Sequence, residues 1–391
     1  MISILAIASA VISLIMVGGF IEDTVTKVRE MYIRQFLGHL RVYKPGYLQQ
    51  GLLHPFDYMI SEPEKVIEAL RSIPQVRKVS PRLTFGGLLS TGDTTLGVVI
   101  DGLDPALEGN AHDRGVMVQG EDLQSAEGFD VLLGKGIAAA IDSHVGDSVV
   151  LVTNTKRGAM NALDLTVRGV FWTAAKAYDD HAVRIPLATA RKLLRTEDVQ
   201  TIAVFLEKTE QTDSARAAIQ ASFKRQGWDY EVKAWQELEE ADYILKVGLF
   251  YRRIFLVLKL IMVIVVTLSI ANTMNMTVFE RIGEIGTLRA IGTKQKGIAA
   301  LFLAEGLVLG LLGGAVGVLG GSVLALVVSK IGIPMPTAPG ATGAWIAHIA
   351  IVPGVLVFAF SVALATALAS SVLPAMKAAR LEIAQALRHN I

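Results

Sequence analysis

A short charged segment between two long apolar stretches constrains the fold of this chain more than any other feature. Residues 272–297 read NTMNMTVFERIGEIGTLRAIGTKQKG, and they separate the apolar runs 254–277 and 298–328. A helix rises about 1.5 Å per residue and the hydrocarbon core of a bilayer is about 30 Å thick, so each run can cross a membrane. We therefore expect the charged segment to lie against one membrane face.

Two further apolar stretches pass the same length test, one at each end of the chain. The 391 residues are 52% hydrophobic with a mean hydropathy of +0.48, which is too apolar for an ordinary soluble enzyme. The expected fold class is an α-helical membrane domain of four transmembrane helices plus an α+β extracytoplasmic domain at 22–253. The transmembrane helices are expected at 1–21, 254–278, 298–330 and 349–375.

Charge is distributed unevenly along the chain, which predicts its orientation in the membrane. The cations of the membrane part gather in the 279–297 loop and in the tail 376–391, whereas the loop 331–348 carries no formal charge. Under the positive-inside rule the first two segments are cytoplasmic, so 331–348 and 22–253 lie outside the cytoplasm. The first span lacks a basic n-region and a small-residue cleavage site, so we expect it to stay uncleaved.

Composition also argues against several kinds of function. The chain has no cysteine, which excludes a disulfide framework and thiolate chemistry. A net charge of +1 gives no reason to expect nucleic acid as a partner. Because the seven histidines are scattered without paired spacing, we expect no metal site. The cluster Asp179, Asp180 and His181 is typical of a solvated turn, and we expect no catalytic residue.

The external domain begins and ends with helical stalks, expected at 22–38 and 238–253. A helix at 61–73, capped by Ser61, and a hairpin of strands 76–89 and 94–101 follow the first stalk. A late unit has a strand at 199–206, a helix at 212–226 and a strand at 230–235. Strands and helices at both ends predict one split α+β domain. The Gly- and Asp-rich region at about 103–185 is then an inserted, mostly-β subdomain.

Three patterns together resemble a known family. They are residues 280–292 (ERIGEIGTLRAIG), the glycine-rich third span, and a tail that runs from Pro374 through Arg380 to Arg388. The order of one span, a large external domain and three more spans is similar to the FtsX-like permeases of ABC transporters. That class includes the MacB efflux pump and the LolC/LolE lipoprotein-releasing permeases. The stretches 39–47 and 169–191 are more similar to the LolC/LolE branch.

The resemblance implies a non-catalytic permease subunit with a porter-like periplasmic domain, multi-pass in the bacterial inner membrane. It would transmit an ATP-driven conformational change to the periplasm (mechanotransmission), for release of lipoproteins or lipids or export of a periplasmic substrate. The implied partners are a cytoplasmic ABC-type ATPase dimer, a second permease subunit that is a copy or a paralogue, a periplasmic acceptor or adaptor protein, and membrane lipid. ATP and Mg²⁺ would bind to the ATPase, so no cofactor is expected on this chain.

Other functions stay open at this point. An FtsX-like subunit that activates a periplasmic cell-wall hydrolase, a MacB-like exporter of peptides or antibiotics, and a receptor without an ATPase all fit the membrane topology. An external domain of about 230 residues favours the transporter over small-domain regulators. The receptor would leave the charged 279–297 segment unexplained.

The segment 279–290, taken as a helix, is the candidate site for ATPase coupling. Ile282, Ile285 and Leu288 recur at helical spacing and form a narrow apolar stripe suited to a groove on a partner. The alternatives are a helix lying on lipid headgroups or a loop capped by its own ion pairs. The residues expected to couple are Glu280, Arg281, Glu284, Ile285, Leu288 and Arg289.

The third span contains two interleaved rows of glycine that permit close helix packing. The expected packing residues are Gly306, Gly310, Gly313, Gly314, Gly317 and Gly321. Their partner is either the fourth span or a second subunit. Glu305 lies inside the same span, where a lone carboxylate is costly, so we expect it to be paired or protonated. Lys259 is expected to anchor the second span beside Arg252 and Arg253.

Overall fold

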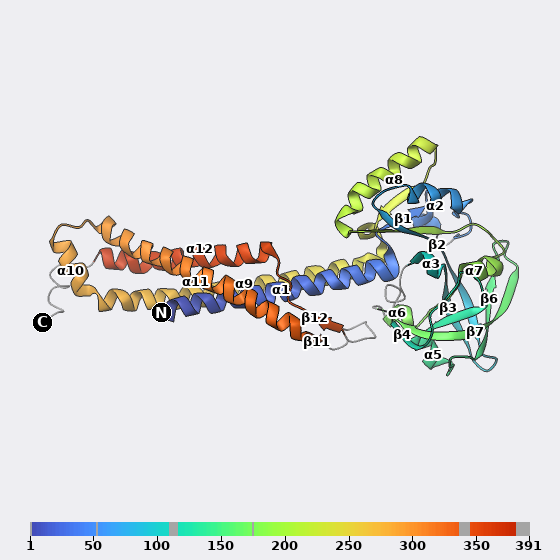
Figure 1. Cartoon of the computed structure of the whole chain (residues 1–391), viewed down its shortest axis with the longest axis horizontal. Coiled ribbons are helices and arrows are strands. Elements are labelled where there is room, and N and C mark those ends of the chain that lie inside the picture. The colour runs from blue at the N-terminus through green and yellow to red at the C-terminus, as the bar shows by residue number, and fades with distance from the viewer. Residues whose placement is uncertain (1, 52–53, 109–115, 174–175, 336–344, 381–391) are drawn as a thin grey trace. The chain divides into compact units, whose positions relative to one another are not determined.

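The computed structural model in Figure 1 describes residues 2–51, 54–108, 116–173, 176–335 and 345–380. The chain divides into two compact units. The membrane unit comprises Met1–Thr26, Val247–Pro334 and Ile346–Ile391, and the head unit comprises Lys27–Lys246 and Met335–Trp345. The expected loop 331–348 and tail 376–391 extend into 336–344 and 381–391, which lie outside the described residues.

Four long helices match the four expected spans. Each has an apolar window long enough to cross a membrane by length and composition. They are α1 (Ile2–Tyr32), α9 (Asp242–Glu280), α11 (Gln295–Ile331) and α12 (Pro353–Ala379). Most of each polar sequence expected as a stalk continues α1 or α9, but α1 ends at Tyr32 and α9 begins at Asp242, inside the predicted ranges 22–38 and 238–253. After α1 a turn of π-helix, η1 (Ile33–Leu37), ends at Gly38, whose φ of 70° favours glycine.

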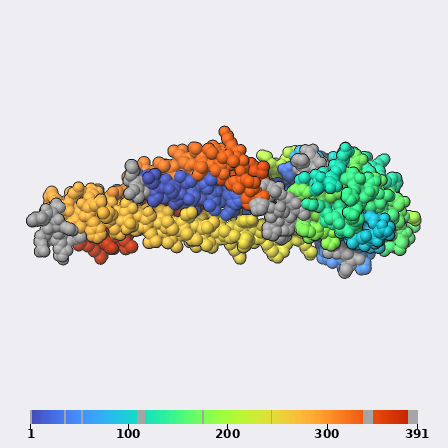
Figure 2. All heavy atoms as spheres, turned by 90° about the horizontal axis from the view of Figure 1, so that it is seen from below, coloured from blue at the N-terminus to red at the C-terminus, as the bar shows by residue number. Residues whose placement is uncertain are grey.

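The helices of the membrane unit differ in how much of their surface they bury. Half of the apolar window of α1 is buried inside the unit, against 11% of that of α9. Figure 2 shows α9 (yellow) as a continuous exposed strip beside α1 (blue). Val266 and Ile270 of α9 join the same buried cluster as Ile7 and Val11 of α1. Most side chains in the apolar window of α9 are therefore available to lipid or to another subunit.

The head unit is built on a ten-stranded sheet with the order β10-β1-β9-β2-β3-β8-β5-β7-β4, while β6 pairs with β2 and β7. Its strands are β1 (Leu40–Tyr43), β2 (Val76–Ser90), β3 (Thr95–Leu103), β4 (Val116–Gly120), β5 (Asp130–Gly134), β6 (Ser148–Asn154), β7 (Met160–Trp172), β8 (Ala182–Pro186), β9 (Thr201–Leu206) and β10 (Glu231–Ala234). The expected hairpin is the antiparallel pair β2 and β3. Two short strands, β11 (Ile333–Met335) and β12 (Trp345–Ala347), lie between α11 and α12 in the sequence.

The inserted subdomain expected at about 103–185 is not confirmed. The long strand β2 pairs through its first part with β9 and through its last residues with β6, which belongs to the supposed insertion. One buried cluster holds Val42 and Ile202 from the ends of the domain together with Val149 and Val167 from the middle. Shared hydrogen bonds and a shared core make the head one unit, because an insertion that stood apart would bury its own core.

Helices cover the head sheet or connect its strands. They are α2 (Pro63–Arg71), α3 (Pro105–Glu108), α5 (Lys135–Ala140), α6 (Lys176–Asp179), α7 (Leu187–Leu194) and α8 (Thr212–Gln226), with shorter turns η2 (Tyr47–Gly51), η3 (Thr209–Gln211), η4 (Trp235–Glu237) and η5 (Glu239–Ala241). The helix α8 has the predicted bounds. The predicted cap at Ser61 is wrong: α2 starts at Pro63, and Glu62, with φ of 51°, holds the N-cap position without a side-chain bond.

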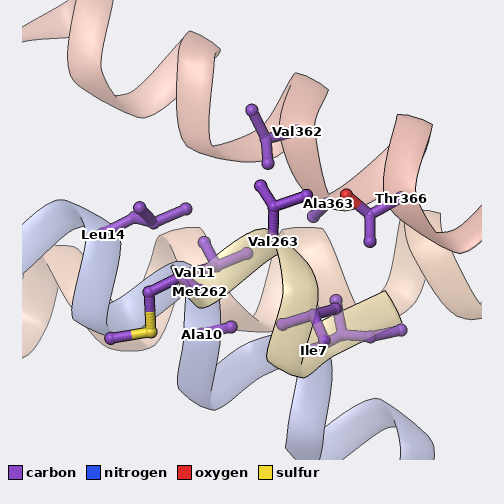
Figure 3. Close-up of a pocket in the computed structure, with 10 residues that line it drawn as sticks. Ile7, Ala10, Val11, Leu14, Met262, Val263, Val362, Ala363 and Thr366 are labelled. Carbon is purple, nitrogen blue, oxygen red and sulfur yellow. The ribbon is translucent and has the colours of Figure 1, made fainter. Parts of the chain in front are cut away.

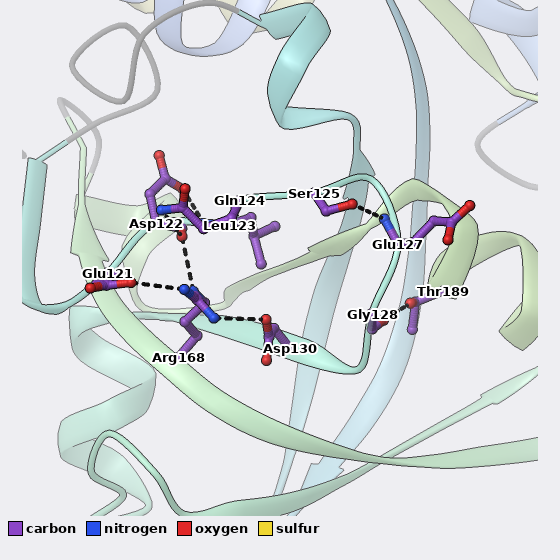
Figure 4. A network of polar contacts seen from close by, with 10 residues as sticks. All are labelled: Glu121, Asp122, Leu123, Gln124, Ser125, Glu127, Gly128, Asp130, Arg168 and Thr189. Carbon is purple, nitrogen blue, oxygen red and sulfur yellow. Dashed lines mark hydrogen bonds and ion pairs between the residues drawn. The ribbon is translucent and has the colours of Figure 1, made fainter.

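Arg168 on β7 organises the loop between β4 and β5 (Figure 4). Its Nη2 lies 2.8 Å from Glu121 Oε2, its Nη1 lies 3.3 Å from Asp130 Oδ2, and its Nε donates to the carbonyl oxygen of Asp122 at 3.2 Å. Three contacts from one planar guanidinium hold both ends of the loop to the same strand. This network is structural, because each of these polar groups already has a partner inside the fold.

Candidate functional site

The candidate coupling segment forms a short helix, α10 (Ile282–Ala290), between α9 and α11. The predicted start at Phe279 is wrong, because α9 continues to Glu280 and Arg281 sits at the N-cap position of α10 with φ of −108°. Glu280 is therefore the last residue of the long helix, and Arg281 is the corner between the two helices.

The apolar side of α10 packs inside the chain. Ile285 is 2% exposed and shares a buried cluster with Val278 and Phe302 of the flanking helices. Ile282 is also buried, whereas Leu288 is 39% exposed and Ile291 is 78% exposed. The expectation that Ile285 offers an apolar contact to a partner is wrong for this structure. The i, i+3 spacing of Ile282 and Ile285 serves the chain's own core.

An exposed row lies on the other side of α10. We call Glu284, Leu288 and Ile291 the exposed row; they are spaced i, i+4 and i+7 and so share one face of the helix. The row combines one carboxylate with two apolar side chains.

Arg281 connects α10 to the first turns of α11. Its Nε donates to Glu284 Oε2 at 2.8 Å, and its Nη1 lies 3.8 Å from Glu305 Oε2. The hydrogen bond to Glu284 is the main reason that the pKa of Arg281 is raised, so this guanidinium stays charged. Glu305, expected to be paired, thus has a cation beside it. The pair is half-exposed, and its contribution to stability is about 1 kcal/mol or less.

Arg289 connects α10 to the end of α12. Its Nη1 donates to the carbonyl oxygen of Ala379 at 3.3 Å. A helix leaves its last four carbonyl groups without helical partners and carries a partial negative charge there, so a guanidinium is well suited to this position. Of the six predicted coupling residues, two thus serve as ties within the chain.

The first glycine row of α11 faces α12. A Cβ atom added at Gly310 would lie 2.9 Å from Cβ of Ala367, and one added at Gly314 would lie 2.9 Å from Cδ2 of Phe360. Gly306, the third member, faces Ser371 in the same way. Such distances leave no room for a side chain, which lets the two helix backbones approach closely.

The second glycine row faces α1. A Cβ atom at Gly313 would lie 2.8 Å from Cβ of Ile7, and one at Gly317 would lie 2.5 Å from Cβ of Val11. Gly321 continues the row against the next turn of α1. The sequence left open whether the partner was the fourth span or a second subunit. In the structure both rows are filled within this chain, one by α12 and one by α1.

A narrow apolar pocket lies where α1, α9 and α12 converge (Figure 3). It is lined by Ile7, Ala10, Val11, Leu14, Met262, Val263, Val266, Val362, Ala363 and Thr366. Thr366 contributes the only hydroxyl group among these side chains. The lining suits hydrocarbon and offers no group for acid–base or metal chemistry.

A buried polar relay joins the upper end of α1 to the head sheet. The main-chain N–H of Leu206 donates to His39 Nδ1 at 3.2 Å, so the imidazole proton is on Nε2, which donates to Thr209 Oγ1 at 3.1 Å. The hydroxyl of Thr209 in turn donates to the carboxylate of Glu30 at 2.8 Å. The sequence reasoning missed this relay, because its members are far apart in the chain.

Burial sets the protonation state of this histidine. His39 is 3% exposed, and desolvation by burial lowers its pKa to about 4. The nearby charges, Glu30, Arg34, Glu210 and Arg29, act in opposing directions and have smaller effects. His39 is therefore neutral at ordinary pH and holds one donor and one acceptor in fixed positions.

The polar cluster at 179–181 is not the solvated turn that the sequence predicted, because Asp179 is fully buried. The buried carboxylate of Asp179 accepts hydrogen bonds from the N–H and Oγ1 of Thr173 at 2.9 and 2.7 Å. Lys176 Nζ lies 2.5 Å from Asp180, and the His181 ring contacts the carbonyl oxygen of Ala177. Within the described ranges, no group of three His, Asp or Glu residues is arranged to hold a metal ion.

Two family models match this chain, and together they cover most of it. The MacB-like periplasmic core domain matches residues 1–222, and the FtsX-like permease C-terminal region matches residues 256–383. The residues between the two matches, 223–255, run from the last turn of α8 into α9.

Curated relatives of the chain include two lipoprotein-releasing proteins. LolE of Haemophilus influenzae, a lipoprotein-releasing system transmembrane protein, is 28% identical over 337 residues, which are 81% of this chain and 79% of that protein. LolC of Neisseria meningitidis serogroup B is 25% identical over 266 residues, 64% of this chain and 62% of that protein. Among solved structures, the periplasmic region of MacB from Actinobacillus actinomycetemcomitans aligns with a TM-score of 0.40 at 14% identity, over 55% of this chain and 97% of that one.

Proposed function

This chain belongs to the FtsX-like permeases of ABC transporters that carry a MacB-like periplasmic core domain, and from this membership we propose that it transmits an ATP-driven conformational change across the bacterial inner membrane. It is a membrane protein with a periplasmic domain. In the proposal, a separate cytoplasmic ATPase dimer hydrolyses ATP, two permease subunits assemble on it, and this chain performs no catalysis. The moving part outside the cytoplasm is the head unit.

The substrate class that we propose is a lipoprotein or another lipid-bearing molecule. The support is the extent of the match to LolE, which covers most of both chains. Export of a periplasmic peptide or antibiotic is the competing outcome, because the MacB-like core domain matches the head.

The exposed row of α10 is the surface that we propose for the ATPase. Its apolar members, Leu288 and Ile291, supply the affinity of docking, and Glu284 supplies the register. The ion pair of Arg281 with Glu305 and the hydrogen bond of Arg289 to Ala379 support this role. They attach α10 to α11 and to α12, so a displacement of α10 would displace both helices. This one observation, an exposed face on a helix held from both sides, carries the proposal.

In the proposal, the conformational change passes from α10 to the head along two long helices, α9 and α1. α9 runs from Asp242 to Glu280, directly before the corner at Arg281, without a break in its hydrogen bonding. α1 is held to α11 through the second glycine row and ends beside the relay of Glu30, Thr209 and His39. Displacement of α10 would therefore act on both helices that enter the head.

The test is co-purification from native membranes in mild detergent, followed by mass spectrometry. We expect an ABC ATPase to accompany the wild type and to be lost from the variant Ile291→Asp. The matched control is Ile331→Asp, because Ile331 is 80% exposed and lies at the other end of α11. Neither substitution removes a buried side chain, so both variants should fold.

Each outcome separates the competing functions. Retention of the ATPase by Ile291→Asp would contradict docking through the exposed row. Co-purification of a cell-wall hydrolase, in place of a substrate or acceptor, would favour a subunit that regulates such a hydrolase. Absence of any ATPase from the wild-type sample would contradict the transporter function. A bound lipoprotein, or a second permease, would define the substrate and the subunit composition.

A further inference from the structure

Two cationic side chains near one end of the α9 apolar run share a face of the helix. Arg252 and Lys259 are seven residues apart, which is two turns, so they differ by only about 20° around the axis. Arg253 points about 100° away from Arg252. The axial separation of Arg252 and Lys259 is about 10 Å, which two long side chains can span if they point toward each other.

Lys259 does point toward Arg252. Its Nζ lies 4.1 Å from the ring centre of Phe255, which is one turn nearer to Arg252 on the same helix. The same Nζ lies 4.1 Å from the ring centre of Phe358, which belongs to α12. Two aromatic faces thus fix the position of this cation at the protein surface instead of letting it move freely.

The ammonium still lacks a strong acceptor. An aromatic face attracts a cation but supplies no oxygen lone pair, and a lysine ammonium has three N–H donors. Among the described residues, no hydrogen bond or ion pair is made by Lys259, Arg252 or Arg253, although the carboxylate of Glu22 acts electrostatically on Lys259. On this face the two cations, Arg252 and Lys259, outnumber the one carboxylate that acts on Lys259, so the surface is positive.

The surroundings of the two cations are those of a lipid-facing surface. Leu256 lies between them on the same face and is 57% exposed, and Leu260, one residue beyond Lys259, is 56% exposed. These exposed leucines offer hydrocarbon contact directly beside a site for negative charge. A free phosphate ion would use the cations alone and leave this apolar surface without a role.

We propose that Arg252 and Lys259 bind the phosphate of an anionic phospholipid, whose acyl chains lie along Leu256 and Leu260. The lipid is held by two charge-assisted hydrogen bonds to one phosphodiester, and Phe255 and Phe358 orient the deeper cation. The excess positive charge selects an anionic headgroup over a zwitterionic one. The site is independent of the proposed transport function and requires only that α9 lies in a membrane.

Native mass spectrometry of the full-length protein tests the site. The wild type, with whatever subunits purify with it, is exchanged into nanodiscs containing phosphatidylglycerol and phosphatidylcholine in equal amounts and then released from them. We expect one phosphatidylglycerol to remain bound in preference to phosphatidylcholine. The variants Lys259→Met and Arg252→Gln should each weaken its retention by about tenfold, because each removes a charged donor.

Control variants test whether lipid retention depends on the face of α9 that carries Arg252 and Lys259. Arg253→Gln removes the same charge from a neighbouring position and should retain the lipid. The thermal unfolding midpoint of each variant shows whether the protein is folded. Equal retention in Lys259→Met and wild type, or equal loss in Arg253→Gln, would overturn the proposal. Displacement of the lipid by added inorganic phosphate would also overturn it, since the ligand would then be the ion.

Discussion

The guanidinium of Arg289 donates a hydrogen bond to the carbonyl oxygen of Ala379, 90 residues further along the chain. The bond satisfies a carbonyl at the C-terminal end of α12 and fixes the orientation of α10. With Ile285 buried on the same side, it leaves Glu284, Leu288 and Ile291 facing outward. The side of α10 that a partner can reach is thus decided by contacts inside the chain.

We predict that Arg289→Gln loosens α10 without unfolding the membrane unit. Loss of this partly buried bond should lower local stability by about 1 kcal/mol and speed amide exchange in 282–290 by about fivefold. Hydrogen–deuterium exchange in detergent measures this rate. Lys296→Gln is the control, because Lys296 is exposed on the adjoining turn. Equal exchange in all three proteins would show that the bond does not hold the helix.

We predict that Gly317→Ala destabilises the packing of α1 on α11. The added methyl group would lie 2.5 Å from Cβ of Val11, a distance that forces the helices apart and costs about 1–3 kcal/mol. Gly354→Ala is the control, since an added Cβ there meets no atom within 4 Å. The thermal midpoint in detergent should fall for Gly317→Ala only. A fall of similar size in both variants would argue against steric packing as the cause.

We predict that Thr209→Val breaks the relay between α1 and the head sheet. The variant keeps the shape of the side chain but leaves the Nε2–H of buried His39 without an acceptor, at a cost of about 1–3 kcal/mol. Thr209→Ser retains the hydroxyl and should unfold in urea much as the wild type does. If the relay transmits motion, Thr209→Val should also uncouple ATP hydrolysis from substrate release. Equal urea midpoints for the Val and Ser variants would contradict the structural part.

We predict that the head loses stability in acid through His39. Burial lowers the pKa of this imidazole to about 4 from an unfolded value of 6.5. Between those values the unfolded chain binds a proton that the folded chain does not, so stability rises with pH in this window. About 3 kcal/mol should be lost as the pH falls from about 6.5 to about 4. Urea unfolding across this range should show the loss in the wild type.

His39→Gln is the comparison for that titration. A glutamine can accept from one side and donate from the other but does not titrate, so its unfolding free energy should depend less on pH over the same range. Parallel pH profiles for the two proteins would mean that groups other than His39 cause the acid sensitivity.

The four membrane helices and the helix α8 could be predicted from the sequence, because each depends on a pattern repeated over many residues. The orientation of α10 could not be predicted. Ile282 and Ile285 form the same stripe whether they meet a partner or the chain's own helices, and only the positions of Val278 and Phe302 distinguish these cases. The glycine rows were visible in the sequence, but their assignment to α12 and α1 depends on tertiary packing.

Features formed by residues far apart in the chain could not be predicted from the sequence either. A boundary at residue 103 was suggested by composition, yet the pairing of β2 with β6 and β9 joins both regions in one sheet. The start of α2 at Pro63 instead of after Ser61 depends on the left-handed backbone of Glu62. The relay through His39 had no local signal beyond a polar residue beside an apolar strand.

The relay also has a consequence for how the protein is made. Glu30 and Thr209 are 179 residues apart in the chain. At a synthesis rate of about 5–20 residues per second, about 10–35 s pass between the appearance of the two side chains at the ribosome. The carboxylate near the end of α1 is thus made well before the hydroxyl that completes the relay. Completion of the head unit around the end of α1 is consequently a late event, which follows the synthesis of nearly all of its strands.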